Sequence, residues 1–387
     1  MHNNSINSYL GFEQGPIRPP SEAYSLLVRV TRNCPWNQCT FCPVYKGTKF
    51  SRRPVDHVKK DIDAVYQHVE GIRKFVDEQD RVPRSEINRI TANVDPKKSP
   101  AFVAAFNWYF AGGLESVFIQ DANSLIIKTT DLEGILRHLK ERFPEIKRIT
   151  SYARSQTVSR MKEGDLKAIG DAGLNRIHIG LESGSDEILK MVKKGVTKGM
   201  HILAGQKVKQ AGIELSEYYM PGLGGRKYLK EHALQTADAL NQINPDFIRM
   251  RTLAIPNRAP LYEDHQSGRF EKCTDVLVVK EILMFIENLD GITSMIKSDH
   301  ILNLFQELEG KLPEDKERML KILRTFLAMD PERQALYQLG RRIGVFSSLT
   351  HMENPYRMAR AQRAYSQLGG AAEDIDRVTN ELVKRFI

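Results

Sequence analysis

Six short runs of β-branched and aromatic residues alternate with helical segments, and this alternation limits the possible fold more than any other feature of the chain. The runs are bounded by Gly, Pro and Asn, as is typical of strands. The predicted strands are Tyr24–Val30, Ser116–Gln120, Lys147–Tyr152, Arg176–Gly180, Ile213–Tyr219 and Phe247–Leu253. Alternation of strands with helices favours right-handed βαβ units and a parallel sheet. The sequence therefore predicts an α/β fold in which six parallel strands form a (β/α)6 partial TIM barrel.

The segments between the strands have helical periodicity. Apolar residues recur every three or four positions over Val58–Val76, which predicts a long helix. Thr130 and Glu133 have the spacing of a capping box and predict a helix N-terminus there. The charged residues 77–100 end in a proline-bounded stretch and predict an exposed loop or insertion.

After Ile255 the alternation stops and the pattern becomes helical. The predicted helices are Val276–Ile286, His300–Leu312, Asp315–Leu327, Pro331–Gly340 and Asp374–Phe386, with no convincing strand among them. We therefore predict an N-terminal extension at 1–20, the partial barrel at 21–255 and a mainly helical C-terminal region at 256–387.

The composition indicates a globular protein without a membrane span. Of the 387 residues, 41% are hydrophobic and 27% are charged, which is enough apolar material for a large core. The most apolar stretch, Ala101–Leu114, is shorter than the ~20 residues that a membrane helix needs. Residues 1–20 lack the basic start and apolar run of a signal peptide. We expect a cytoplasmic protein with no membrane partner.

The chain is basic, with 57 Lys and Arg against 48 Asp and Glu, which gives a formal charge of +9. Such a charge suits an anionic partner or a well-solvated surface. The basic pairs are scattered, and no long basic run is interleaved with aromatic residues. On the sequence alone, nucleic acid is therefore an unlikely partner.

Three of the four cysteines, Cys34, Cys39 and Cys42, lie within nine residues directly after the first predicted strand. This crowding excludes a disulfide framework and indicates metal or redox chemistry. A structural zinc site would need a fourth ligand, from distant Cys273 or a histidine, and a dithiol redox motif would not need Cys34. Three thiolates on a [4Fe-4S] cluster would leave one iron open to bind and activate a ligand.

This loop, with Phe41 just before the third cysteine and further βα units after it, resembles the radical S-adenosylmethionine (radical SAM) superfamily. The resemblance covers about residues 21–255. It implies that Cys34, Cys39 and Cys42 hold a [4Fe-4S] cluster whose open iron binds S-adenosylmethionine, with Phe41 beside the cofactors. Reduction of the cluster would then cleave S-adenosylmethionine to methionine and a 5′-deoxyadenosyl radical. Four residues and then two separate the cysteines here, whereas the most common family spacing is three and then two.

The same resemblance implies cosubstrate contacts at later strand ends. The run Gly180–Ser185 is similar to the Gly-Leu-Glu-Ser-Gly-Ser run of the coproporphyrinogen oxidase-like and methylthiotransferase-like branches, and it implies that Glu182 accepts hydrogen bonds from the ribose hydroxyls. An alternative is that Glu182 caps the following helix. Lys194 falls where relatives place a cation for the cosubstrate carboxylate. Glu217 precedes a glycine-rich turn that resembles the family's turn beside the cosubstrate.

Two further strand ends carry candidate contacts. Asp121 and Asn123 follow the second predicted strand, where the family carries a Gly-Gly-Glu-like segment that meets the amino group of the cosubstrate. Their oxygens would accept from an ammonium group, and the alternative is an Asx turn. Arg154 follows the third strand, where its guanidinium suits the methionyl carboxylate. The alternative for Arg154 is a salt bridge at the rim of the barrel.

The absence of other cysteine clusters favours a single-cluster enzyme. Cys273 is the only cysteine outside the loop, which does not fit an auxiliary cluster, and about twenty residues ahead of the barrel do not fit a corrinoid-binding domain. We therefore expect an enzyme that takes electrons from a reducing donor and abstracts hydrogen from an unidentified small or macromolecular substrate. Two alternatives stay open: an RNA-modifying radical SAM enzyme, and a non-catalytic iron-sulfur protein of electron transfer.

Overall fold

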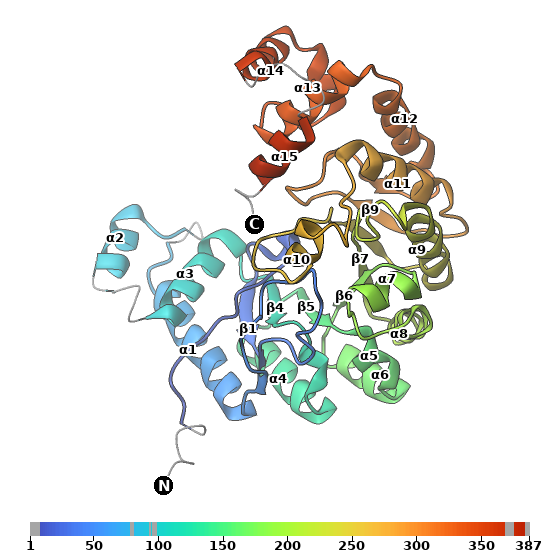
Figure 1. Ribbon diagram of the computed structural model, residues 1–387. Helices are drawn as coiled ribbons and strands as arrows, with labels where there is room; N and C mark the ends of the chain where they lie inside the picture. Colours follow the sequence, from blue (N-terminus) through green and yellow to red (C-terminus); the bar gives the residue numbers. More distant parts are fainter. Residues whose placement is uncertain (1–7, 78–80, 93, 95–98, 368–374, 384–387) are drawn as a thin grey trace. The chain divides into compact units, whose positions relative to one another are not determined.

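The computed structural model describes residues 8–77, 81–92, 94, 99–367 and 375–383 (Figure 1). The main sheet has the strand order β1-β4-β5-β6-β7-β8-β9-β10. Its strands are β1 Leu26–Arg29, β4 Ser116–Gln120, β5 Arg148–Ala153, β6 Arg176–Glu182, β7 Glu214–Tyr219, β8 Phe247–Met250, β9 Met295–Lys297 and β10 Gly310–Lys311. A separate antiparallel ribbon pairs β2, Thr31–Arg32, with β3, Ser51–Arg52. The predicted α/β class and its mainly parallel sheet are confirmed.

The sheet has eight strands, however, and not the six that the sequence predicts. All six predicted strands are present, as β1 and β4 to β8. The two additional strands, β9 and β10, lie in the region for which only helices were predicted. β9 pairs in parallel with β8, and β10 pairs antiparallel with β9.

The predicted helix His300–Leu312 is wrong. The segment forms turns followed by β10. Asn303 explains why, because its side chain accepts a hydrogen bond from the Thr252 amide at 2.9 Å and donates one to the Met250 carbonyl at 2.8 Å. Such contacts satisfy backbone groups outside a helix and compete with helical hydrogen bonding. These turns bury most of the apolar residues of the segment, namely Leu302, Leu304, Phe305, Leu308 and Leu312, and leave Ile301 exposed.

The described chain forms two compact units. The first contains the described residues of 1–35, 47–178 and 207–214, and the second contains those of 36–46, 179–206 and 215–387. The boundary passes through β6, between His178 and Ile179. The division into 1–20, 21–255 and 256–387 stays a prediction.

The first unit contains the strands β1, β4 and β5 and the helices that follow them in the chain (Figure 1). These helices are α1 Val55–Arg73, α2 Arg84–Ala92, α3 Pro100–Gly112, α4 Thr129–Arg142, α5 Ser155–Arg160 and α6 Glu163–Asp171. The predicted long helix is α1, whose face from Val58 to Ile72 is buried and packs against α3 and α4. Burial of this apolar stripe fixes the helix on the sheet.

Two predictions for this unit need correction. The segment 77–100 is not only a loop, because it contains α2, although no residue of that helix is buried. The capping box at Thr130 is also wrong, since α4 begins one residue earlier and Lys128 is its N-cap. The start of α4 therefore lacks a side-chain cap.

The second unit contains the C-terminal helices. Its elements, with α8 shared with the first unit, are α7 Asp186–Met191, α8 Lys198–Gln210, α9 Leu229–Ile243, α10 Leu261–Gln266, α11 Asp275–Glu287, α12 Lys316–Leu327, α13 Pro331–Arg342, α14 Pro355–Gln367 and α15 Ile375–Val383. The predicted helices at 276–286, 315–327 and 331–340 are confirmed as α11, α12 and α13. The last predicted helix contains α15, while residues 374 and 384–387 lie outside the described residues. Among the helices described, none is long and apolar enough to cross a membrane.

Candidate cluster and cosubstrate site

The three cysteines lie in the loop that joins β2 to β3, and all three are half-buried. Pairing of Thr31 with Arg52 closes the base of this loop. Asn33 and Asn37 adopt left-handed backbone angles, with φ of 69° and 49°. Asn tolerates this conformation better than most residues, so these two positions allow the tight path of the chain around the cysteines. Cys34 belongs to the first unit, and Cys39 and Cys42 belong to the second.

In the second unit, the cysteine loop is fixed to the segment that follows α7. The Thr40 amide donates to the Val192 carbonyl at 3.0 Å. The Trp36 indole donates to the Lys193 carbonyl at 2.7 Å. Gly195 leaves no room for a side chain, because a Cβ there would lie 2.3 Å from the Trp36 ring. Two hydrogen bonds and one close packing contact therefore hold the loop in place.

Phe41 connects the cysteine loop to the apolar core and to a charged group. Its ring packs against a buried cluster that includes Ile188, Val192 and Leu223. The Lys194 ammonium lies 5.5 Å from the centroid of the same ring, within the range of a cation–π interaction. Phe41, one of the two residues between Cys39 and Cys42, thus contacts Lys194, a predicted cosubstrate residue.

Glu182 and Lys194 form an ion pair at the carboxyl end of β6. Lys194 Nζ lies 3.1 Å from Glu182 Oε1, and each side chain is only 13% exposed. Glu182 ends the strand in the left-handed region, with φ of 64°. Gly180 provides the space for the pair, since a Cβ at this position would lie 2.3 Å from Glu182 Oε1 and 3.0 Å from Lys194 Nζ. The pair is thus folded back over the backbone of its own strand.

Glu182 is not the cap of the following helix. Ser185 is the N-cap of α7, and its hydroxyl accepts a hydrogen bond from the Ile188 amide at 3.3 Å. The structure therefore removes the capping alternative that the sequence left open. The Glu182 carboxylate is held by Lys194 instead.

Glu217, on β7, is fully buried. Burial raises the pKa of this carboxyl well above its usual range, and the negative charge of Glu182 raises it further. The positive charge of Lys194 and the Leu181 amide lower the pKa by less. The raised pKa favours the protonated form of Glu217, next to the charged Glu182–Lys194 pair.

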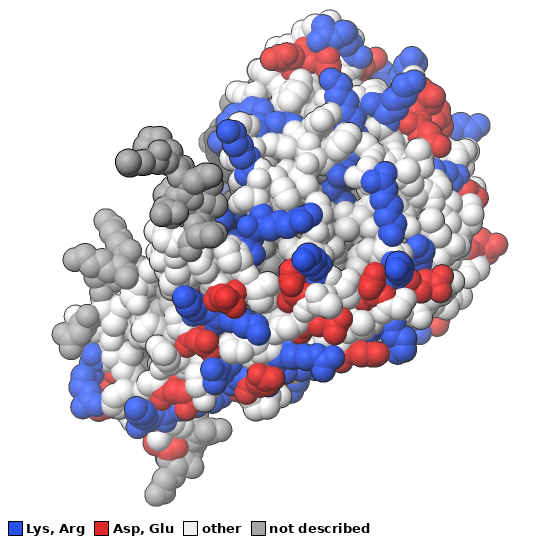
Figure 2. All heavy atoms as spheres, turned by 90° about the horizontal axis from the view of Figure 1, so that it is seen from below, with Lys and Arg blue, Asp and Glu red and all other residues white. Residues whose placement is uncertain are grey.

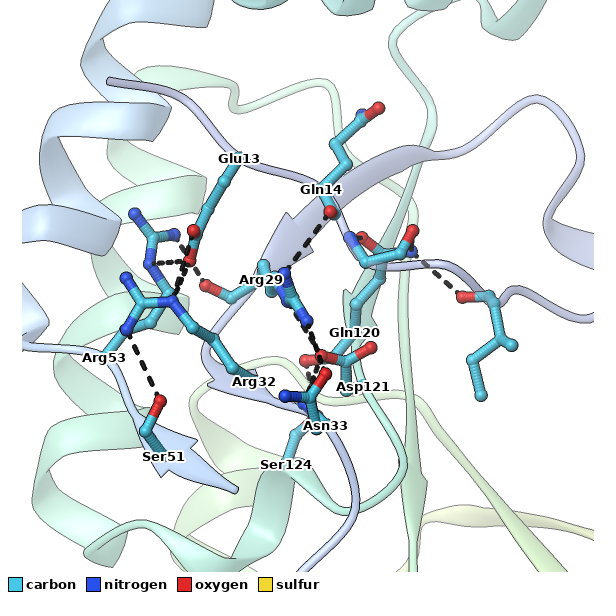
Figure 3. A network of polar contacts seen from close by, with 12 residues as sticks. Glu13, Gln14, Arg29, Arg32, Asn33, Ser51, Arg53, Gln120, Asp121 and Ser124 are labelled. Atoms are coloured by element: carbon cyan, nitrogen blue, oxygen red, sulfur yellow. Dashed lines mark hydrogen bonds and ion pairs between the residues drawn. The ribbon is translucent and has the colours of Figure 1, made fainter. Parts of the chain in front are cut away.

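Asp121 lies in the first unit, within a dense polar network (Figure 3). The Arg29 guanidinium donates to Asp121 Oδ2 at 2.8 Å, and the Asn33 amide donates to the same oxygen at 3.0 Å. The Gly15 backbone covers the other oxygen so closely that a Cβ there would lie 2.3 Å from Asp121 Oδ1. Gln120 holds Gly15 in this position by accepting from its amide at 2.7 Å and donating to its carbonyl at 3.2 Å. Asp121 thus positions Asn33, the residue before Cys34.

Asn123 and Arg154 are joined to each other in the same unit. The Asn123 side-chain oxygen accepts from the Arg154 amide at 3.1 Å, and its nitrogen donates to the Thr157 hydroxyl at 2.8 Å. Asn123 thereby fastens the loop after β4 to the start of α5, where Arg154 is the N-cap residue. Both the oxygen and the nitrogen of the Asn123 side-chain amide therefore have partners within the protein.

Sequence reasoning missed Gly180, Trp36 and Arg29. Gly180 is detectable in principle, because a glycine inside a strand often marks a close approach of other groups. Trp36 and Arg29 have no comparable signal, since their roles depend on partners far along the chain at Lys193 and Asp121.

The donor set of the loop suits an iron-sulfur cluster better than a single metal ion. Within the described part of the chain, no three His, Cys, Asp or Glu side chains are gathered so that they hold one metal ion. The ligands of a [4Fe-4S] cluster bind different irons, so its thiolates do not converge on one point. Three half-buried cysteines in one loop fit this arrangement.

Comparison with known proteins finds similarity to one family. Residues 100–238 match the family model of the radical SAM superfamily. Over this part, the chain is similar to enzymes that use a [4Fe-4S] cluster and S-adenosylmethionine.

Two curated relatives are named as tRNA enzymes. A tRNA uridine(34) acetyltransferase of Methanocaldococcus jannaschii is 22% identical over 274 residues, which cover 66% of this chain and 47% of that protein. A tRNA-2-methylthio-N(6)-dimethylallyladenosine synthase of Christiangramia forsetii is 27% identical over 198 residues, which cover 49% of this chain and 36% of that protein. The chain spans about half the length, or less, of the curated relatives it matches.

Solved structures are less similar. Coproporphyrinogen III oxidase (HemN) from Escherichia coli has a TM-score of 0.45 at 14% identity, covering 68% of this chain and 52% of that chain. Methylornithine synthase (PylB) has a TM-score of 0.43 at 14% identity, covering 80% of this chain and 83% of that chain. Similarity at this level does not assign a function.

Proposed function

We propose that Cys34, Cys39 and Cys42 hold a [4Fe-4S] cluster and that Glu182, Lys194 and Glu217 line the adjoining site for S-adenosylmethionine, on a partial barrel. The observation that carries this proposal is the contact of one ammonium, that of Lys194, with both the Phe41 ring and the Glu182 carboxylate. It brings the loop of Cys39 and Cys42 to the end of β6. Parallel α/β folds bind their ligands at this end of the strands.

The residues of this chain orient and shield the cosubstrate. The Glu182 carboxylate accepts hydrogen bonds from the ribose hydroxyls, and Lys194 attracts the methionyl carboxylate. The raised pKa of buried Glu217 favours its uncharged form, so this carboxyl adds little negative charge beside Glu182. Asp121, Asn123 and Arg154 belong to the first unit, and their contacts to the methionyl group stay predictions from the sequence. Cys34, Cys39 and Cys42 would hold the cluster, which, once reduced by an external donor, would supply the electron for cleavage of S-adenosylmethionine to methionine and a 5′-deoxyadenosyl radical that abstracts hydrogen from the substrate.

We further propose that the substrate is an RNA. The curated relatives named as tRNA enzymes favour this alternative over an unidentified small substrate. The excess of Lys and Arg suits a polyanion. On the face drawn in Figure 2, basic and acidic side chains are interspersed, so this face offers no broad area of one sign. Because these curated relatives are named as tRNA enzymes, the proposed RNA substrate replaces our expectation from the sequence that nucleic acid is an unlikely partner.

The test begins with anaerobic reconstitution of the full chain with iron and sulfide. Reduction with dithionite in the presence of S-adenosylmethionine is expected to release 5′-deoxyadenosine, which mass spectrometry detects. A Cys39→Ala, Cys42→Ala double variant serves as the control and is expected to lose iron and activity together. An intact cluster in the wild-type protein without release of 5′-deoxyadenosine would overturn the proposal and favour an electron-transfer protein.

The RNA substrate is tested in the same reaction with unfractionated tRNA. Nucleosides from digested tRNA are compared by mass spectrometry with those from a reaction that lacks dithionite. A new nucleoside that depends on the reductant is expected. Release of 5′-deoxyadenosine without any change in the tRNA would retain the radical SAM reaction and reject tRNA as the substrate.

A further inference from the structure

Helix α14, Pro355–Gln367, presents an exposed stripe made of a tyrosine, two arginines and a glutamine. Tyr356, Arg360, Arg363 and Gln367 are spaced four, three and four positions apart, which places them on one face of the helix. All four are exposed, and Tyr356 is 70% exposed. The other side of α14 is fixed by buried Ala361 and Tyr365.

The stripe is cationic and carries no acidic side chain. Residues 355–367 contain three arginines and neither Asp nor Glu. Arg357 is used within the fold, since it donates to the Val345 carbonyl at 3.0 Å and contacts the His351 ring at 2.7 Å. In the part of the chain that the structure describes, Arg360 and Arg363 form no ion pair, and the only hydrogen bond of Arg363 is to Ala359 in its own helix.

An exposed tyrosine beside two exposed guanidinium groups has the composition of a surface for single-stranded nucleic acid. Unpaired bases stack on aromatic rings, and arginines contact the phosphates of the same strand. A site for an acidic peptide would use the arginines but would have no need for an exposed aromatic ring. The helical spacing also explains why the sequence shows no basic run, because the three residues are separated by four and three positions.

We infer that the exposed face of α14 binds a single-stranded segment of RNA, with Tyr356 stacking on a base and with Arg360 and Arg363 on phosphates. This inference rests on the proposed RNA substrate and assigns to it a surface outside the residues of the cluster and cosubstrate site. It also gives α14 a role that the radical reaction does not require.

The test measures binding of a fluorescently labelled single-stranded RNA to the full-length holoenzyme at several salt concentrations. Tyr356→Ala is expected to weaken binding roughly five- to hundredfold at every salt concentration, because stacking does not involve counterions. Arg360→Gln with Arg363→Gln is expected to reduce the slope of log K against log salt by about 1.4, since each lost phosphate contact on a single strand removes about 0.7.

A matched control removes two other exposed cations of the same unit. Lys280 on α11 and Lys321 on α12 are exposed, and Lys280→Gln with Lys321→Gln changes the net charge by the same amount. This variant is expected to keep both the affinity and most of the slope. Equal losses in the control and arginine variants, with no effect of Tyr356→Ala, would overturn the inference and indicate only a general electrostatic attraction. Stronger competition by polyglutamate than by unlabelled RNA would also overturn it and favour an acidic protein partner.

The outcome is separable from that of the proposed function. Binding of RNA through α14 without any RNA modification would retain the surface and reject the proposed reaction on RNA. Unchanged RNA binding and modification in all α14 variants would reject the surface and retain the reaction. Circular dichroism melting curves of each variant are expected to match that of the wild type, which controls for loss of the fold.

Discussion

Replacing Gly180 by alanine tests the role of Glu182 without removing a charged group. The added Cβ would lie 2.3 Å from Glu182 Oε1, whereas ordinary contacts begin at about 3.4 Å. The carboxylate must therefore move by about 1 Å or more. Gly180 lies in β6 and does not have a left-handed φ, so alanine strains no backbone there. Because the atoms that the Cβ meets are the ends of flexible side chains, we expect the fold to be retained.

We expect Gly180→Ala to weaken the binding of S-adenosylmethionine. A displacement of this size lengthens a hydrogen bond from Glu182 to the ribose beyond the usual range of 2.7 to 3.2 Å. A hydrogen bond to a charged group contributes about 1.5–3 kcal/mol. The Kd of Gly180→Ala for S-adenosylmethionine is therefore expected to rise by about ten- to hundredfold.

Isothermal titration of S-adenosylmethionine into anaerobically reconstituted protein measures this change. Gly71→Ala is the matched control, because nothing lies within 4 Å of a Cβ at that position of α1. The control is expected to keep its affinity, with a slightly higher melting temperature from the better helix propensity of alanine. An unchanged Kd in Gly180→Ala, with normal iron content, would refute the assignment of Glu182 as a cosubstrate contact.

Three further predictions concern Cys273, Asp121 and Glu217. Because burial raises the pKa of the Cys273 thiol to about 12, Cys273→Ser is expected to keep its iron, whereas Cys39→Ser is expected to lose it. Loss of iron from Cys273→Ser, measured by a colorimetric iron assay, would contradict a cluster held by Cys34, Cys39 and Cys42 alone. Asp121→Asn breaks the ion pair with Arg29 and is expected to lower the melting temperature; an unchanged melting temperature with weaker S-adenosylmethionine binding would show that Asp121 is mainly a ligand contact. Glu217 has a raised pKa in the folded protein, so above pH 4.5 the unfolded chain releases a proton that the folded protein keeps. The contribution of Glu217 to the free energy of unfolding therefore falls as pH rises. Glu217→Gln is therefore expected to gain stability relative to wild type between pH 5 and pH 8 in urea unfolding, and a pH-independent difference would show that the carboxyl is ionised.

The strands of the sheet could be predicted where burial leaves a local pattern. The boundaries predicted for β4, Ser116–Gln120, are those of the structure, because its apolar residues lie between two glycines at the end of α3, Gly112 and Gly113, and a polar loop that begins at Asp121. β9 and β10 have three and two residues, and no periodicity is detectable over so short a length. They exist because neighbouring strands pair with them, and such long-range pairing leaves no mark in the local sequence.

The candidate site was predictable in its residue types but not in its connections. The spacing of the cysteines and the run around Glu182 identified both halves. The space above Gly180 and the cation–π contact of Lys194 with Phe41 depend on the folded chain. The same limit applies to Asp121, whose partners Arg29 and Asn33 come from a distant strand and loop.

The shared contacts of Lys194 suggest an order of assembly. Its ammonium contacts Phe41, in the loop of the cluster, and Glu182, at the end of β6. Because the side chains of the Glu182–Lys194 pair are only 13% exposed, separating the two charges without a new partner is costly. Movement of the cysteine loop would shift Phe41, remove one contact of Lys194 and change the position of the ion pair. A cluster held by the three thiolates would add to the two hydrogen bonds that already hold the loop, and would thereby restrain the groups proposed to bind S-adenosylmethionine. The site is therefore expected to bind its cosubstrate tightly only after the cluster is in place.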